Sequence, residues 1–370
     1  MCFIQPTHRS FMKWLRSRTN HGKDACKSGY TSMLTEAKLD LMLTTPSARM
    51  IEDVKKIKGD IIILGAGGKM GPTLAILAKN AFEAAGCSNR VIAVSRFSDP
   101  FAMKLLNNNK IECISCDMME HGAVDRLPDC ENVIYMAGKK FGTSANSAPT
   151  WAMNAWLPAL VAERYQKSNI VVFSSANIYR FCPISYCGAD ENASVEPVGE
   201  YAQSVLAREK MFEYGSMTYG TKTLMYRLSY ACDMRYGVLH DIAQHVLNDE
   251  PVGLDPTAFA CIWQGDANEI AIRSLLHVSN PAAKLVVTGP ECVSIRKTAL
   301  KFGELFNKKV IFTGEEQPTA LLADASKCCQ IMGYPSVSMA QMIAWQAEYL
   351  LGGGRTLNKP THYEERKGDY

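Results

Sequence analysis

From residue 59 onward, short runs of branched apolar residues alternate with longer stretches of helical periodicity. The runs have strand length and no polar alternation, which is typical of strands buried on both faces of a parallel sheet. They are DIIIL (60–64), RVIAV (90–94), IECIS (111–115), NVIYM (132–136), NIVVF (169–173) and TLMYR (223–227). Helical stretches, such as residues 69–86 and 150–166, lie between them. The alternation predicts an α/β fold with a doubly wound parallel sheet and right-handed crossovers.

The chain changes character near residue 228. Short helical segments then mix with brief strands, AKLVVTG and KKVIFTG, which predicts a smaller α+β C-terminal substrate lobe. The tail carries three successive glycines and dense charge, which indicates an extended arm or a loose end. We expect a basic leader (1–32), a helical lead-in (33–58), the sheet domain (59–228), the lobe (229–350) and the arm (351–370).

Residues 1–32 contain six Lys or Arg, one Asp and many Ser and Thr. This composition is typical of an organelle transit peptide. The alternative, which we favour, is an untranslated or irregular leader upstream of a true start at Met33; in either case we expect the segment to be poorly ordered. The rest of the chain has a slight excess of acid, so we expect neither nucleic acid nor an anionic membrane as partner. No apolar run approaches the roughly 18 residues of a membrane span.

The chain has 13 cysteines in no even spacing, which favours reduced thiols and a cytoplasmic protein, with organelle import if the leader is a transit peptide. Its 7 histidines are unclustered, so no metal site is predicted.

A glycine-rich loop, GAGGKMG, directly follows the first predicted strand and opens a helix. Gly65 permits a tight turn, Gly68 lets the backbone approach a pyrophosphate, and Gly71 lets the helix pack closely on the strand. The helix N-terminus supplies oriented N–H groups. The loop predicts a Rossmann dinucleotide site in residues 59–228, although a merely tight turn is the alternative. The contacting residues would be Gly65, Gly67, Gly68, Lys69, Met70 and Gly71.

The second predicted strand ends in VSRF, where a dinucleotide fold places an acidic residue on the adenosine ribose. Ser95 and Arg96 stand there instead, and a guanidinium can pair with a 2′-phosphate. This pattern favours NADP and leaves NAD open, because Arg96 could instead stack on the adenine of either cofactor. After the third strand, Asp117, with Met118 beside it, could accept from the adenine amino group or cap a helix.

Several stretches, taken in order over about residues 59–350, resemble the extended short-chain dehydrogenase/reductase family, the NAD(P)-dependent epimerases and dehydratases that act largely on sugars and nucleotide sugars. The stretches are GAGGKMG, VIYMAGKKFG, MNAWLPALVAE, VVFSSANIY, PVGEYAQSVLARE, YRLSYA and IWQGDANEIA. The resemblance implies an enzyme with a small-molecule substrate, a sugar derivative, and a homodimer formed by two long helices.

The resemblance also implies residue roles. Ala137 and Gly138 would border the nicotinamide ribose, Asn154 would steady the site, Ser175 would hold the reacting oxygen, and Tyr201 would be the acid/base. Asn177 is assigned to the substrate, together with Trp263 and Gln264, which could equally belong to a packed junction with the lobe.

One position departs from the family pattern, Pro-x-x-x-Tyr-x-x-x-Lys-x-x-x-Glu. Pro197, Tyr201 and Glu209 match it, but Val205 replaces the lysine. That lysine provides a positive charge which favours tyrosinate, because the free pKa of tyrosine is about 10. Without it, deprotonation at pH 7 would cost about 4 kcal/mol, enough to slow a reaction about a thousandfold.

Another cation could replace the lysine. Lys210 is out of phase on the helix, and Arg208, about two turns along and near 10 Å away, is predicted to be too far for direct contact. We therefore expect Lys140, or less readily Lys139, to supply the charge; the alternative is that both are solvated loop residues. Two functions remain: an active enzyme, or a catalytically silent dinucleotide-binding sensor or scaffold.

Overall fold

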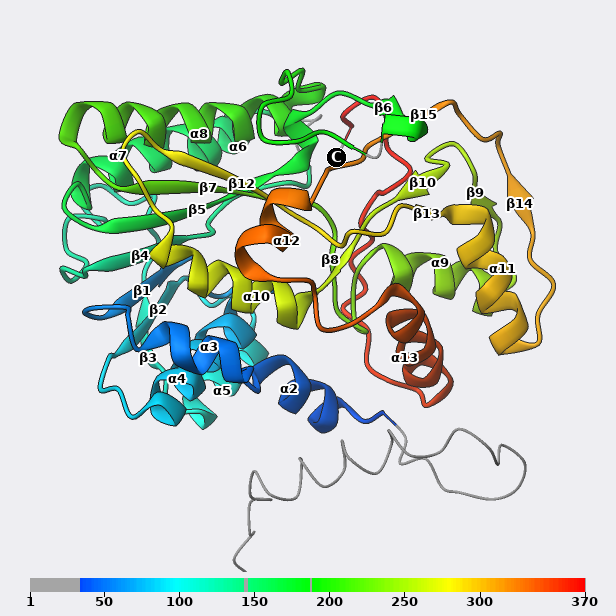
Figure 1. Ribbon diagram of the computed structural model, residues 1–370, viewed down its shortest axis with the longest axis horizontal. Helices are drawn as coiled ribbons and strands as arrows, with labels where there is room; N and C mark the ends of the chain where they lie inside the picture. Colours follow the sequence, from blue (N-terminus) through cyan, green and yellow to red (C-terminus); the bar gives the residue numbers. More distant parts are fainter. Residues whose placement is uncertain (1–33, 143–145, 187, 370) are drawn as a thin grey trace, which may run out of the picture. The chain divides into compact units, whose positions relative to one another are not determined.

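Seven parallel strands form the central sheet of the protein, which a computed structural model describes for residues 34–142, 146–186 and 188–369 (Figure 1). The first six confirm the strands predicted from the apolar runs. The predicted leader lies outside the described residues. In chain order the strands are β1 (Ile61–Leu64), β2 (Val91–Ser95), β3 (Glu112–Ser115), β4 (Asn132–Tyr135), β5 (Asn169–Ser175), β7 (Thr223–Leu228) and β12 (Ala283–Val287).

The strand order, β3-β2-β1-β4-β5-β7-β12, confirms the doubly wound fold. The chain moves outward from β1 to β3 on one side and from β4 to β12 on the other. β1 and β4 pair directly, with Leu64 opposite Tyr135. The loops that leave these two strands therefore diverge at their carboxyl ends, which is where doubly wound sheets bind ligands.

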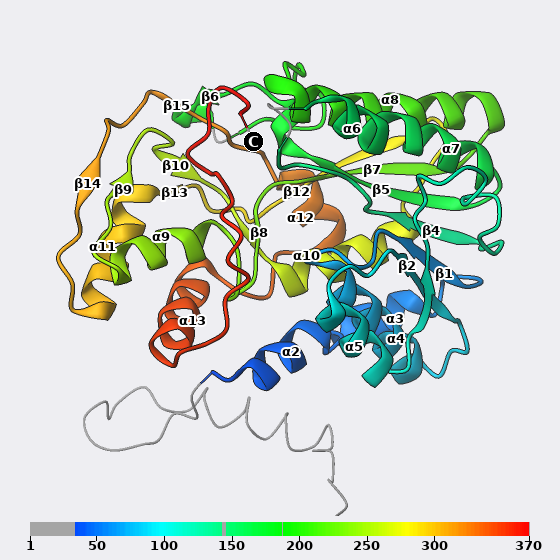
Figure 2. The ribbon, with the colours of Figure 1, turned by 180° about the vertical axis from the view of Figure 1, so that it is seen from behind.

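Helices cover both faces of the sheet, because successive strand residues point to opposite sides (Figures 1 and 2). In β1, Ile61 and Ile63 belong to one hydrophobic cluster, and Ile62 and Leu64 to another. The first cluster includes α3 (Ala48–Val54), α4 (Gly71–Ala85) and α10 (Gln264–Arg273). The second includes α7 (Leu157–Arg164) and α8 (Gly199–Tyr219), and α7 continues from α6 (Ala148–Trp151) and a π-helical turn, η1 (Ala152–Trp156). Helix α5 (Pro100–Asn108) packs beside α4 and β3.

Beyond residue 228, the structure differs from the prediction at AKLVVTG. This run was expected in the lobe, but it forms β12 and pairs with β7 in the main sheet. The reason is its three successive apolar residues, Leu285, Val286 and Val287, which are all buried, as a strand covered on both faces requires. The sheet therefore takes a strand from the segment that was predicted as a separate lobe.

The remaining elements form a third hydrophobic cluster beside the sheet. Its helices are α2 (Glu36–Thr44), α9 (Val238–Leu247), α11 (Ile295–Phe306) and α13 (Met339–Leu351). Short strand pairs join this region: β8 (Ala231–Cys232) with β11 (Ile262–Trp263), β9 (Val252–Gly253) with β14 (Phe312–Thr313), β10 (Ala258–Phe259) with β13 (Val293–Ser294), and β6 (Cys182–Pro183) with β15 (Thr319–Ala320). Helix α12 (Ser326–Met332) packs on β12, and the 3-10 turns are η2 (Ala176–Ile178), η3 (Ile184–Tyr186) and η4 (Ser274–Leu276).

The chain after α13, residues 352–369, which we call the C-terminal arm, runs across this region toward β6 (Figure 2). Arg366 donates hydrogen bonds to the carbonyl oxygens of Asp255 and Thr319. Near its end the arm touches the start of α8, where a Cβ on Gly199 would lie 2.4 Å from the oxygen of Gly368. Within the described ranges, no helix combines the length and apolar content that a membrane span requires.

Candidate active site

A pocket of about 310 Å³ lies where β1, β4 and β5 end. It brings together residues predicted from separate stretches of the sequence, and it adds one residue of the C-terminal arm. The predicted residues that line it are Gly65, Gly68, Lys69, Met70, Gly138, Lys139, Lys140, Ser175, Asn177, Tyr201 and Gln264; Arg208, Tyr236 and Thr361 line it as well.

The glycine loop packs closely against its neighbours at its first and last glycines. Gly65 has φ +96°, and a Cβ there would lie 2.5 Å from the nitrogen of Ala137. A Cβ on Gly71 would lie 2.3 Å from the carbonyl oxygen of Ala66, so α4 begins directly against the loop. A Cβ on Gly68 would meet only the oxygen of Gly65 at 3.5 Å, and the N-terminus of α4 has no side-chain cap. The loop therefore leaves space and N–H groups for a phosphate.

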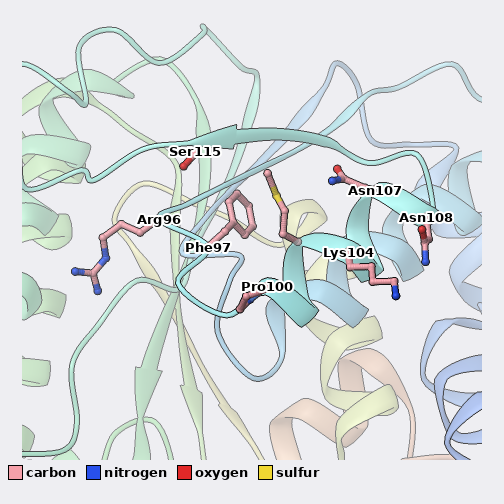
Figure 3. Close-up of a pocket in the computed structure, with 8 residues that line it drawn as sticks. Arg96, Phe97, Pro100, Lys104, Asn107, Asn108 and Ser115 are labelled. Atoms are coloured by element: carbon pink, nitrogen blue, oxygen red, sulfur yellow. The ribbon is translucent and has the colours of Figure 1, made fainter.

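Next to this loop, the end of β2 carries no carboxylate. The side chain of Ser95 lies against Gly67, where a Cβ would be 2.5 Å from its Oγ. Arg96 is mostly exposed, and its guanidinium is 3.9 Å from the carboxylate of Asp117, which also accepts from the backbone of Met119. A surface pocket lies between Arg96 and α5; Figure 3 shows the guanidinium pointing away from Lys104 and Asn107. Met118 and Ala137 are buried.

Tyr201 and Ser175 meet in the pocket through a hydrogen bond. Ser175 ends β5 and Tyr201 lies in the first turn of α8. Ser175 donates to the side chain of Asn177 at 2.8 Å and accepts from its backbone N–H at 3.2 Å, so η2 holds the hydroxyl in place. Burial raises the pKa of Tyr201, while the charge of Arg208 and the bond to Ser175 lower it.

Asn154 is fully buried in the π-helical turn η1, a distortion that is often found at functional sites. Its side chain accepts from the backbone N–H of Lys139 at 2.9 Å and donates to the carbonyl oxygen of that residue at 2.8 Å. It also donates to Ser204 at 2.9 Å and accepts from Arg208 at 2.7 Å. Asn154 therefore fixes both the loop after β4 and the guanidinium of Arg208.

Arg208 lines the pocket and its charge acts on Tyr201, although our sequence reasoning set it aside. Spacing along the helix axis suggested that it was too far from Tyr201, but helical side chains point toward the N-terminus of their helix. Its guanidinium reaches back one turn, to the same Asn154 that binds Ser204, and also donates to the oxygen of Phe173 at 2.7 Å. A Cβ on Gly138 would lie 2.4 Å from Nη2, which is why a glycine is needed there. Val205 itself is fully buried in a small apolar cluster.

Lys140 also lies beside the tyrosine, with its ammonium 5.7 Å from the ring centroid of Tyr201. It donates to the carbonyl oxygen of Thr361 in the C-terminal arm at 3.1 Å. Burial lowers the pKa of Lys140 to about 8, against a smaller upward effect of Asp241. The side chain is therefore a half-buried wall of the pocket rather than a solvated loop residue.

The other predicted residues have structural partners. Trp263 is buried in the core, with its ring 5.5 Å from that of Trp345. Gln264 lines the pocket and donates to Thr73 of α4 at 3.1 Å. Glu209 forms a fully buried ion pair with Arg227 at 2.8 Å and accepts from Ser174 at 2.5 Å, which ties α8 to β5 and β7.

Comparison with known proteins gives one family match. Residues 61–246, half of the chain, match the model of the NAD dependent epimerase/dehydratase family. A search of curated proteins gives no match.

Solved structures share the fold. UDP-glucuronic acid 4-epimerase from Bacillus cereus, in complex with NAD, has a TM-score of 0.67 at 17% identity, over 79% of this chain and 99% of its own. UDP-glucose 4-epimerase from Thermotoga maritima, with UDP-glucose, has a TM-score of 0.65 at 15% identity, over 80% and 99%. MoeE5, with UDP-glucose and NAD, has a TM-score of 0.64 at 17% identity, over 80% and 99%.

Proposed function

Because the chain belongs to the NAD dependent epimerase/dehydratase family, we propose that it is an NAD(P)-dependent epimerase, dehydratase or oxidoreductase that acts on a sugar, nucleotide sugar or related polyhydroxylated compound. The observation that carries the proposal is the hydrogen bond between Tyr201 and Ser175 in the pocket that the glycine loop borders. UDP-sugars and NAD are the ligands named for the structural neighbours, which supports a sugar derivative as the substrate.

The residues at the pocket fit a dinucleotide. The open space at Gly68 and the uncapped N-terminus of α4 suit a pyrophosphate. Arg208 lines the same pocket, and its buried Nε–H has no hydrogen-bond partner among the described residues. When bound, the cofactor supplies a nicotinamide ring that accepts or returns a hydride.

The chain itself supplies proton transfer and positioning. Tyr201 takes the proton of a substrate hydroxyl, or returns it, while Ser175 binds the same oxygen. The positive charge of a lysine or an arginine can favour tyrosinate, but the two side chains keep that charge up to different pH values. The pKa of Lys140 is about 8, whereas a guanidinium stays charged to well above the range in which tyrosine titrates. We therefore assign the support of tyrosinate first to Arg208, and treat Lys140 as the alternative.

Arg96 supports NADP as the preferred cofactor, because no carboxylate at the end of β2 opposes a 2′-phosphate. Its distance of 3.9 Å from Asp117 means that a phosphate would compete with this carboxylate for the guanidinium. NAD remains the alternative, since the family name and the complexes of the neighbours refer to NAD.

A catalytically silent sensor is the second candidate function, and Val205 is the observation that favours it. The test begins with titration of the full-length protein with NADH and NADPH, followed by cofactor fluorescence. Turnover of UDP-sugars is then compared between the parent protein, Tyr201→Phe and the control Tyr219→Phe, which alters an exposed tyrosine of the same helix. We expect the parent protein to bind a dinucleotide. We expect Tyr201→Phe, but not Tyr219→Phe, to lower the turnover rate by at least about a hundredfold. Binding without turnover in the parent protein supports the sensor, and no dinucleotide binding refutes both functions.

A further inference from the structure

Two lysines that line the pocket lie near the same aromatic ring, that of Phe141. The Nζ of Lys69 lies 5.1 Å from the ring centroid of Phe141, and the Nζ of Lys140 lies 5.5 Å from the same centroid. Lys69 also sits over Tyr236 at 3.2 Å, and Lys140 over Tyr201 at 5.7 Å. The two ammonium groups therefore lie at the reacting end of the pocket, held by aromatic faces that attract cations.

The positive charge here exceeds the negative charge. Among the described residues, no carboxylate lies within ion-pair distance of Lys69. Asp241, the carboxylate whose charge acts on both lysines, accepts hydrogen bonds from the backbone and hydroxyl of Thr361 at 2.7 and 2.6 Å. Lys359, in the C-terminal arm, adds a further positive charge that acts on Lys69.

Such an arrangement is costly in the ligand-free protein. Burial, followed by the charges of Lys140 and Lys359, lowers the pKa of Lys69 to about 7. Half-buried like charges persist where they serve a ligand of opposite charge, and strongly shifted groups in a pocket are typical of functional sites. The contacts with Phe141 and Tyr236 cannot neutralise the charge, because an aromatic ring carries no net charge.

We propose that Lys69 and Lys140 together bind a carboxylate carried by the substrate. This inference rests on the proposed function and narrows its substrate class to an acidic sugar derivative. Thr361 closes the same end of the pocket by accepting from Lys140, so the C-terminal arm takes part in the site. The diphosphate of the cofactor is another anion that these lysines could bind, and the experiment separates the two ligands.

The test measures affinities at pH 7 by calorimetry, using full-length protein saturated with the dinucleotide it binds. Two pairs of probes differ only in the acid: glucuronate with glucose, and UDP-glucuronate with UDP-glucose. The variants are Lys69→Met, Lys69→Arg, which keeps the charge, and the control Lys79→Met, which removes a lysine of α4 that pairs with Glu83 outside the pocket. Thermal unfolding verifies that each variant is folded.

The parent protein should bind the acidic member of at least one pair about tenfold tighter or more, as expected for a charge-assisted contact. Lys69→Met should remove most of this preference, while Lys69→Arg and Lys79→Met retain it. Above pH 7, binding of the acidic probe should be accompanied by proton uptake, because a bound anion raises the pKa of Lys69. Calorimetry in buffers of different ionisation enthalpy measures this uptake. The charged or titratable groups that face Lys69 are Lys140, Lys359, Asp241 and Tyr236.

Equal affinity for acidic and neutral probes overturns the inference and leaves the proposed function intact, provided that dinucleotide binds. A Lys69→Met variant that loses affinity for the dinucleotide while keeping the acid preference also overturns it, and assigns the lysines to the cofactor. Failure of the parent protein to bind any dinucleotide overturns the proposed function itself.

Discussion

Replacing Arg208 with methionine should raise the pKa of Tyr201 and move the onset of activity to higher pH. The guanidinium is the charge that lowers this pKa in the folded protein, and Asn154 and the oxygen of Phe173 hold it in place. Methionine keeps much of the length of the side chain and removes the charge. Since the tyrosinate is the form that loses stabilisation, the shift must be upward.

The size of the shift follows from the helix geometry. Seven residues at about 1.5 Å each place the two Cα atoms about 10 Å apart along the axis. The arginine reaches back toward Tyr201, so we take a charge separation of about 5–10 Å, which at an effective dielectric constant of about 20 gives about 1.7–3.3 kcal/mol. This energy corresponds to a rise of about 1.2–2.4 units in the pKa of Tyr201.

Lys140→Met provides the matched comparison. Its ammonium is 5.7 Å from the ring of Tyr201, so a charge present at the pH of tyrosine ionisation would have an effect of similar size. Burial lowers the pKa of Lys140 to about 8, however, so most of that charge is gone when the tyrosine titrates. We therefore expect a shift below about 0.5 pH units for this variant.

The assay incorporates fluorotyrosine at position 201 and follows its ¹⁹F resonance against pH, which requires no substrate. Arg208→Lys, which keeps a charge, should restore part of the parent value, and Arg164→Met, which removes an arginine paired with Asp129, should leave it unchanged. Thermal unfolding accompanies each titration, since Arg208→Met also removes the hydrogen bonds that the guanidinium donates to Asn154 and to the oxygen of Phe173. An unchanged titration in Arg208→Met with a large upward shift in Lys140→Met would refute the reasoning and make Lys140 the partner.

Four further predictions concern the cofactor site and the core. Gly71→Ala should lower the unfolding temperature by several degrees, because its Cβ would lie 2.3 Å from a carbonyl oxygen. Gly68→Ala should keep its stability and weaken dinucleotide binding about tenfold or more in fluorescence titrations; unaltered binding would place the pyrophosphate elsewhere. Arg96→Ala should lower the affinity for NADPH at least about tenfold and the affinity for NADH less than about threefold; equal losses of affinity would indicate that Arg96 stacks on the adenine instead. Glu209→Ala should destabilise the protein by about 3–5 kcal/mol in urea unfolding, because it leaves Arg227 buried without its partner; a cost below about 1 kcal/mol would contradict this.

Much of the fold was predictable because its signals are local. Buried parallel strands must be continuously apolar, so the runs at 60–64 and 169–173 identified strands before any contact was known. AKLVVTG was recognised as a strand for the same reason, but its place beside β7 was not, because pairing partners are set by packing between segments far apart in the chain. The division into a sheet domain and a lobe was therefore too simple.

The sequence by itself determined the doubly wound sheet and the glycine loop, because each depends on residue types at short, regular spacings. The resemblance to the family pointed to Tyr201 and Ser175, which both line the pocket. Only the tertiary structure decided which cations surround the tyrosine. The bond from Arg208 to Asn154 spans 54 residues, and the bond from Lys140 to Thr361 spans 221. Spacing along a helix gives the separation of backbones, whereas a charge acts from the end of a side chain whose direction is set by its distant partners.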